Sequence, residues 1–338
     1  MNKTAGGFLK LSREQRELRE REILAPAATC AADSRGRNVE EEPDPIRTAF
    51  ERDRDRIYYS KAFRRLKHKT QVFLNPEGDH FVTRLTHTLQ VTQIGRSLAE
   101  ALGLNEALTE AICLGHEVGH PPFGHTGEVA LSPYVEGDWL HSEQSVRVFE
   151  ILEPINLSWE VLDGIRAHTW KVSPGPATPE GMLCRYADRI AYLVHDMHDA
   201  IRAGILVPGD IPQAARDAFG DEPGGKWIGS MIHAVVEGTH AAGEVAMEPG
   251  MLEAMQAFRD FMFENVYLRP ASNLQANKAV KLLRDLVDHF LEHPDEMPAT
   301  YRDRESSERM QVIDFVAGMS DRYALRVHDD LFRPSGQV

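Results

Sequence analysis

Apolar residues recur at helical spacing along most of the chain after residue 45. The clearest case is the stretch 83–101, in which one side of a helix collects Leu85, Leu89, Ile94 and Leu98. No stretch shows the strict alternation of a half-buried strand, a Walker loop or an internal repeat. The pattern therefore predicts an all-α protein. Its main helices are expected at residues 108–117, 142–149, 182–199, 251–267, 279–292 and 310–325.

Shifts in composition divide the chain into three parts. Residues 1–45 read as a polar N-terminal arm, with an exposed helix at 11–24 and an irregular, charged segment after it. Proline and glycine become frequent between 205 and 225, which indicates a boundary. We therefore predict a helical core over residues 46–205 and a C-terminal helical subdomain over 206–338 that packs on it.

Residues 46–73 mix cations with apolar side chains, among them Phe63, Leu66, Val72 and Phe73. This mixture is typical of a helix with one buried face. Its charged side is either a solvated basic face or a strip that faces phosphate or another subunit.

The stretch Ile112 to Glu128 carries the densest candidate chemistry. Asn105 is a suitable N-cap for the apolar helix before it, and Pro121 and Pro122 cannot continue that helix. We expect His116 and Glu117 in the last helical turn. The residues on the turn and loop beyond it are His120, His125 and Glu128. Three imidazoles so close to carboxylates favour a divalent metal with a proton-transfer group over satisfied core histidines.

Other polar residues fall where a site could recruit them. Asp188 lies in the middle of an apolar helix, where an unpaired carboxylate would be costly. His87 lies on the apolar face of its helix, and His141 is expected at a helix N-terminus that Ser142 caps. His168 ends a helix and suits a structural or a functional role equally. By spacing, one helix face holds Asp188, Tyr192, His195 and Asp199.

Composition narrows the classes of function. The 338 residues carry a net charge of −14, which argues against broad nucleic-acid binding and leaves single-stranded DNA without support from charge. A phosphorylated substrate would need local cations. No apolar run approaches the roughly 18 residues of a membrane span, and residues 1–22 lack a signal-peptide core. Three cysteines without a CxxC pair suggest a reducing, cytoplasmic location.

With these residues in view, the chain resembles the HD-domain superfamily, and within it the deoxyguanosine triphosphate triphosphohydrolase-like proteins. The HD pattern of a His, a His-Asp pair and a distant Asp corresponds to His87, His116-Glu117 and Asp188. The sequence departs from the family twice, with Glu117 in place of Asp and with Ser142 where the family usually has Asn. The matching stretches are Asp53-Arg-Asp-Arg-Ile57, Phe63-Arg-Arg-Leu66, Lys69-Thr-Gln-Val-Phe73, Thr83-Arg-Leu-Thr-His87, Gly119-His-Pro-Pro-Phe-Gly-His-Thr-Gly-Glu128, Phe263-Glu-Asn-Val-Tyr267 and Ala317-Gly-Met-Ser-Asp-Arg-Tyr323.

The resemblance implies an HD-domain helical core with additional C-terminal helices. It also implies hydrolysis of dGTP, or of dNTPs in general, to deoxynucleoside and tripolyphosphate. A divalent ion such as Mn, Mg or Fe would be bound by His87, His116, Glu117 and Asp188. Proton transfer would fall to His120, His125 and His141, with His125 our first choice for the acid. Phosphate contacts are expected from Arg84, Arg189 and Arg259. Sugar contacts are expected from Gln71, Tyr192, Asp196 and Tyr267, with Asp196 on the 3′-OH and Tyr267 excluding a 2′-OH.

Two alternatives stay open at this stage. The chain could be another HD phosphohydrolase, a nucleotide phosphomonoesterase or a phosphodiesterase. Alternatively, Glu117 and Ser142 could have weakened catalysis and left a nucleotide- or DNA-sensing oligomer. In either case we expect a homo-oligomer, with room for an allosteric nucleotide.

Overall fold

The computed structural model describes residues 8–73, 78–302 and 305–334, and they form an all-α fold, as predicted. Two isolated antiparallel bridges pair Arg37 with Ser158 and Thr70 with Thr83. The helices are α1 (Arg13–Ile23), α2 (Ala49–Tyr59), α3 (Lys61–Arg65), α4 (Arg84–Leu102), α5 (Glu106–Gly115), α6 (His125–Leu131), α7 (His141–Arg147), α8 (Trp159–Ala167), α9 (Pro179–Arg202), α10 (Gln213–Phe219), α11 (Gly225–Ala242), α12 (Pro249–Met262), α13 (Pro270–Glu292), α14 (Ala299–Arg302), α15 (Glu308–Ala317) and α16 (Asp321–Phe332).

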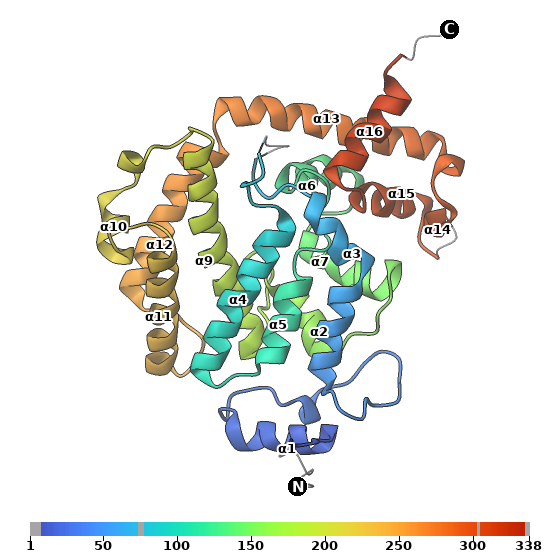
Figure 1. Cartoon of the computed structure of the whole chain (residues 1–338). Coiled ribbons are helices and arrows are strands. Elements are labelled where there is room, and N and C mark those ends of the chain that lie inside the picture. The colour runs from blue at the N-terminus through green and yellow to red at the C-terminus, as the bar shows by residue number, and fades with distance from the viewer. Residues whose placement is uncertain (1–7, 74–77, 303–304, 335–338) are drawn as a thin grey trace.

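The core is built on α4, α5 and α9, which pack against one another, with α2 and α8 also against α5 (Figure 1). Gly103 ends α4 in the left-handed conformation, at φ +67°, and the Asn105 side chain then caps α5 by accepting from the Leu108 amide. The two helices approach closely at Gly95, where an added Cβ would lie 2.9 Å from Cys113 Sγ. This close packing fixes α4 beside the C-terminal end of α5.

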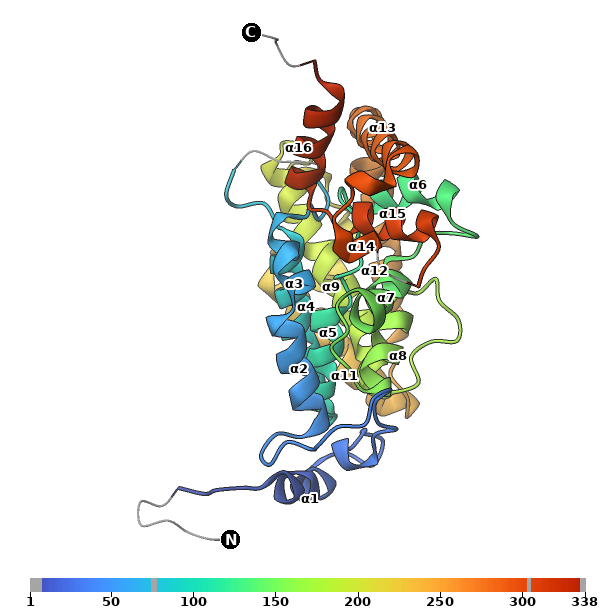
Figure 2. The same ribbon diagram turned by 90° about the vertical axis from the view of Figure 1, so that its right-hand side faces the viewer.

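A second apolar cluster joins the C-terminal helices to the segment that follows α5. Leu131 and Phe123 of that segment are buried with residues of α13, α15 and α16. In both views α13 lies at the opposite end of the molecule from α1 (Figures 1 and 2). The C-terminal helices therefore cover the loop that carries His120.

Several predicted boundaries are wrong in an instructive way. The helix before His116 ends at Gly115, so His116 is its C-cap and Glu117 lies beyond it. His125 opens α6 instead of lying in a loop, and Glu128 is inside that helix. Ser142 does not cap α7, whose N-cap position is Leu140. Residues 310–325 form two helices, because the chain turns between Gly318 and Ser320.

The arm before α2 is tied to the core more firmly than its composition predicts. Helix α1 is exposed, as expected, with no buried residue. Beyond it, the Thr29 amide and hydroxyl both donate to Glu180, at 2.9 and 2.8 Å. Arg37 pairs with the buried carboxylate of Asp53. Buried partners on α2 and α9 thus order a segment that was expected to be irregular and solvated.

Among the described residues, no helix has both the length and the apolar character that a membrane span requires.

Candidate metal and catalytic site

Four side chains from three helical segments converge to form what we call the His87 cluster. His87 comes from α4, His116 and Glu117 follow α5, and Asp188 lies on α9. Each offers one ligand atom, and these atoms all lie within 4.8 Å of one another. His87 Nε2 is 3.1 Å from Asp188 Oδ1, and His116 Nε2 is 3.5 Å from Glu117 Oε1. The four residues that the family resemblance grouped as metal ligands therefore lie close together in the fold.

The His116 ring shows that this cluster fits a metal ion. Its Nδ1 lies 2.6 Å from the Cys113 carbonyl oxygen, to which it donates, so Nε2 carries the lone pair. That Nε2 is buried and has no hydrogen-bond partner in the described part of the chain. Burial, with only part of the effect opposed by Glu117 and Asp188, lowers the pKa of His116 and keeps the ring neutral. A neutral imidazole with an unused lone pair beside two carboxylates is a suitable donor set for a divalent ion.

Both carboxylates of the cluster are held ionised. Burial acts to raise the pKa of Glu117, but Arg84 and the neighbouring histidines outweigh it and hold that pKa well below its usual range. For Asp188, burial is outweighed by the hydrogen bond from His87 and by His116, which lowers its pKa to about 2. Ionised carboxylates are the form that ligates metals.

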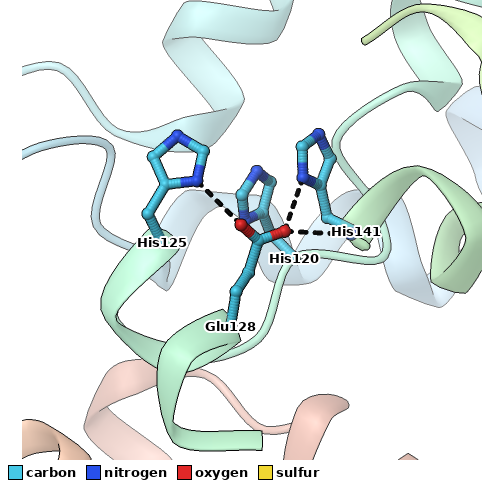
Figure 3. Close-up of side chains that lie close together, drawn as sticks. All are labelled: His120, His125, Glu128 and His141. Carbon is cyan, nitrogen blue, oxygen red and sulfur yellow. Dashed lines mark hydrogen bonds and ion pairs between the residues drawn. The ribbon is translucent and has the colours of Figure 1, made fainter. Parts of the chain in front are cut away.

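A second group, which we call the Glu128 cluster, consists of His120, His125, Glu128 and His141 (Figure 3). Glu128 accepts from His125 Nδ1 at 2.9 Å and from His141 Nδ1 at 2.7 Å. The His120 ring stacks on His141, with centroids 3.8 Å apart. The three candidate proton-transfer histidines are thus brought together. Glu128 was recognised in the sequence only as part of the motif, yet it is the group that orients two of the three rings.

His120 links the two clusters. Its Nε2 lies 3.6 Å from Glu117 Oε1 of the His87 cluster. Burial, followed by Arg84 and His141, lowers the pKa of His120 well below its usual value. His120 is therefore a neutral ring between the two groups of ligands.

His168, which was left open between two roles, is buried between the two clusters. Its Nδ1 donates to the Ile165 carbonyl oxygen at 2.7 Å, and its Nε2 lies 3.1 Å from His141 Nε2. Its ring centroid is 4.9 Å from that of His116. Burial, then His116 and His141, lowers the pKa of His168 to about 3. His168 is therefore a neutral ring that packs against His116 and contacts His141.

Two of the predicted sugar contacts form a hydrogen-bonded pair. Tyr267 donates to Asp196 Oδ2 at 2.8 Å, although 71 residues separate them. Burial raises the pKa of Asp196 to about 7 and that of Tyr192 to about 12. Gln71 Oε1 is buried and has no hydrogen-bond partner among the described residues.

The three predicted phosphate-binding cations differ in their surroundings. Arg84 is buried and pairs with Glu117. Arg259 lies 4.4 Å over the Phe263 ring and 3.3 Å from the exposed Asp260, and its positive charge acts on Tyr192 and Tyr267. Arg189 lies 4.5 Å over the ring of Trp170. Sequence reasoning missed Trp170. Its only signal in the sequence is that it is an aromatic residue two positions after His168.

With this geometry in hand, the comparisons with known proteins are specific. Residues 84–193 match the HD domain model, and residues 245–330 match the phosphohydrolase-associated domain. A deoxyguanosinetriphosphate triphosphohydrolase-like protein from Caldanaerobacter subterraneus subsp. tengcongensis is 46% identical over 329 residues, or 96% of each chain. The chain belongs to this family. One from Desulfatibacillum aliphaticivorans is 42% identical over 96% of this chain and 99% of its own.

The predicted family is thereby confirmed, and the protein is a metal-dependent phosphohydrolase of the HD type. The HD match spans His87 to Asp188 and so contains every residue of both clusters. Among solved structures, a hypothetical protein from Aquifex aeolicus aligns with 83% of this chain and 68% of its own, with a TM-score of 0.48 and 22% identity.

Proposed function

We propose that the protein hydrolyses deoxynucleoside triphosphates to deoxynucleoside and tripolyphosphate. The observation that carries this proposal is the adjacency of the two clusters, which His120 joins at 3.6 Å from Glu117. One cluster suits a divalent ion, and the other holds histidines that a carboxylate orients. Relatives named deoxyguanosinetriphosphate triphosphohydrolase-like support this choice of substrate class.

His87, His116, Glu117 and Asp188 would hold the ion in this proposal. When bound, a divalent ion supplies a Lewis acid for a phosphate oxygen of the substrate. Nitrogen and carboxylate donors together suit Mn, Fe or a similar ion, with Mg as a weaker fit.

His125 would donate the proton to the leaving 5′-oxygen. Glu128 accepts from its Nδ1, so its Nε2 is directed away from the carboxylate. Its side chain is 76% exposed, whereas His120 and His141 are buried. Exposure lets His125 reach a substrate, while the hydrogen bond to Glu128 orients the ring.

The remaining polar groups would bind the rest of the nucleotide. Arg189 has an aromatic ring against its guanidinium and is suited to meet phosphate. Tyr267 and Asp196 form a rigid pair that would meet the sugar. The Tyr267 ring would leave no room for a 2′-OH and so would favour deoxynucleotides.

Product analysis tests the proposal. Metal-loaded protein is incubated with each dNTP and NTP, singly and in mixtures, and the products are separated by anion exchange. We expect tripolyphosphate and deoxynucleoside from dNTPs, and the mixtures reveal any activating nucleotide. Inorganic phosphate or a nucleoside monophosphate as the product would contradict the proposal and favour another HD phosphohydrolase. In His87→Ala, metal content and activity should fall together.

We also propose that the protein acts as a homo-oligomer. Phe63 and Leu66 pack into the protein's own core, whereas Arg64 and Lys67 beside them are exposed. Exposed apolar side chains available for a subunit contact include Tyr59, Val129 and Leu268. Light scattering with and without nucleotide should exceed the 38.0 kDa of one chain.

A further inference from the structure

The Glu128 cluster is itself a set of metal-ligating atoms. His120, His125, Glu128 and His141 each offer one ligand atom, and the four atoms lie within 4.8 Å of one another. None of these residues belongs to the His87 cluster, which has its own four ligands. Three imidazoles and one carboxylate form a donor set that borderline ions such as Zn²⁺, Co²⁺ and Ni²⁺ favour.

The cluster combines buried ligands with a route from solvent. His120, Glu128 and His141 are buried, and they come from the loop before α6, from α6 and from the start of α7. His125 alone is exposed and forms the outer side of the group. Figure 3 shows the three imidazoles arranged around the Glu128 carboxylate. An ion could therefore enter past His125 and keep a water ligand on that side.

An unsatisfied atom provides independent support. Nδ1 of His120 is buried and, within residues 8–73, 78–302 and 305–334, has no hydrogen-bond partner, although the ring is otherwise fixed by stacking on His141. A buried polar nitrogen without a partner costs free energy, about 1–3 kcal/mol when its desolvation is not compensated. A ligand that used this lone pair would remove that cost.

Two features oppose metal binding at the Glu128 cluster and determine which of the two clusters binds metal first. Glu128 already accepts hydrogen bonds from His125 and His141, so each ring must shift its Nδ1 proton to Nε2 or release it before Nδ1 can ligate. The positive charges of Arg84 and Lys69 also act on His120. The Glu128 cluster should thus fill after the His87 cluster, at higher metal concentration.

We propose that the Glu128 cluster is a second, inhibitory site for nitrogen-preferring divalent ions. An ion bound there takes the Glu128 carboxylate and the His125 imidazole out of proton transfer. Binding depends only on the cluster, whereas the inhibition rests on the proposed function.

Cobalt is the probe, because its visible absorption reports a site of low coordination number. The full chain, freed of metal, is titrated with Co²⁺, and bound metal is measured by equilibrium dialysis. The test variant is His125→Asn, whose exposed position leaves the buried packing intact; Glu128→Gln is the second. His289→Asn is the matched control, because His289 also pairs with a carboxylate, Glu296, at 2.8 Å and lies outside both clusters.

We expect two equivalents of Co²⁺ in the wild type and in His289→Asn, and one in His125→Asn and Glu128→Gln. Mn²⁺, which prefers oxygen donors, should stop at one equivalent in all four proteins. A single Co²⁺ in the wild type, or two retained in both test variants, would overturn the second site. Loss of the second equivalent in His289→Asn would assign it to surface histidines and would also overturn the proposal.

Inhibition is measured separately, with dNTP turnover in Mn²⁺ and increasing Zn²⁺. We expect turnover to fall by roughly 10²-fold, the contribution of a general acid, and to recover when a chelator removes Zn²⁺ and Mn²⁺ is restored. Full turnover with the second site occupied would overturn the inhibitory role. If the protein binds two Co²⁺ but releases no tripolyphosphate from any dNTP, the proposed function fails while the second site stands.

Discussion

Arg84 and Glu117, 33 residues apart in the sequence, form a buried ion pair that joins the first turn of α4 to the segment after α5. The pair uses Glu117 Oε2, while Oε1 faces His116 at 3.5 Å and His120 at 3.6 Å. The extra methylene of Glu, compared with the usual Asp, lets one carboxylate meet Arg84 and the cluster together. The main role of Arg84 in this structure is therefore to pair with Glu117.

Shortening Glu117 to Asp tests separately its part in metal binding and its ion pair with Arg84. In Glu117→Asp we expect metal binding to be kept and turnover to be equal or higher, because Asp is the usual family residue. The Arg84 contact should weaken, at a cost below the roughly 3–5 kcal/mol of removing one partner of a buried pair. Metal content, turnover and urea unfolding are measured on one preparation, with Arg84→Gln as the comparison. An inactive, metal-free Glu117→Asp would show that the surrounding side chains depend on the longer residue.

Replacing His125 tests proton transfer apart from metal binding. In the variant His125→Ala the His87 cluster is untouched, so Mn²⁺ content and dNTP binding should be retained. Turnover should fall roughly 10²–10⁴-fold, the range of a general acid. The melting temperature of the same preparation shows whether lower turnover comes from a loss of stability. Near-normal turnover would remove His125 from catalysis and transfer the role to His120 or His141.

Helical periodicity and apolar runs were enough to predict the all-α fold and most of the core helices, because α4 and α9 each keep one side in the core and α5 is buried on every side from Leu108 to Gly115. The ends of helices were predicted less well. Gly115 ends α5 earlier than expected, where an added Cβ would lie 2.4 Å from Ile165 of α8. That contact comes from a segment 50 residues away, which no local pattern reveals.

The convergence of the site was predictable in part. Resemblance placed His87, His116, Glu117 and Asp188 in one group, but spacing alone did not show that Glu128 binds His125 and His141. The reason is that α6 begins at His125, so His125 and Glu128 are one helical turn apart. A loop prediction for His125 hid that relation.

The Trp170 ring should position Arg189 for the substrate. In Trp170→Leu the guanidinium loses its aromatic partner, at a cost of about 0.5–1 kcal/mol for an exposed cation–π contact. The KM for dNTP should therefore rise roughly two- to fivefold with kcat retained. Trp170→Phe should recover most of the effect. Trp159→Leu is the matched control, since Arg35 stacks on Trp159 at the other end of α8. Equal KM values in Trp170→Leu and wild type would contradict this role.

Lys69 connects the C-terminal helices to the catalytic loop. Its ammonium group donates to the carbonyl oxygens of His120 and, at 3.1 Å, of Ala317 at the end of α15. Asp321 accepts from the amides of Thr70 and Phe123, at 2.8 and 3.0 Å. These contacts fix the backbone on both sides of Pro121 and Pro122.

The buried Lys69 should also make stability depend on pH. Burial, with Arg65 next, lowers the pKa of Lys69 to about 7 in the folded protein, against roughly 10.4 when unfolded. Between these values the unfolded chain binds more protons, so the free energy of unfolding should rise with pH, by up to about 1.4 kcal/mol per pH unit. Below pH 7 both states are protonated, and this contribution is flat.

We therefore expect the wild type to gain stability relative to Lys69→Met as pH rises from 7 to 10. Urea unfolding at each pH measures the difference, from which the other titrating groups cancel. Lys67→Met is the control for the loss of one lysine side chain, because Lys67 is exposed two positions earlier. A difference between wild type and Lys69→Met that is independent of pH would show that Lys69 keeps its ordinary pKa. The ammonium would then remain charged at all working pH values, and its two carbonyl partners would be sufficient to hold a buried cation.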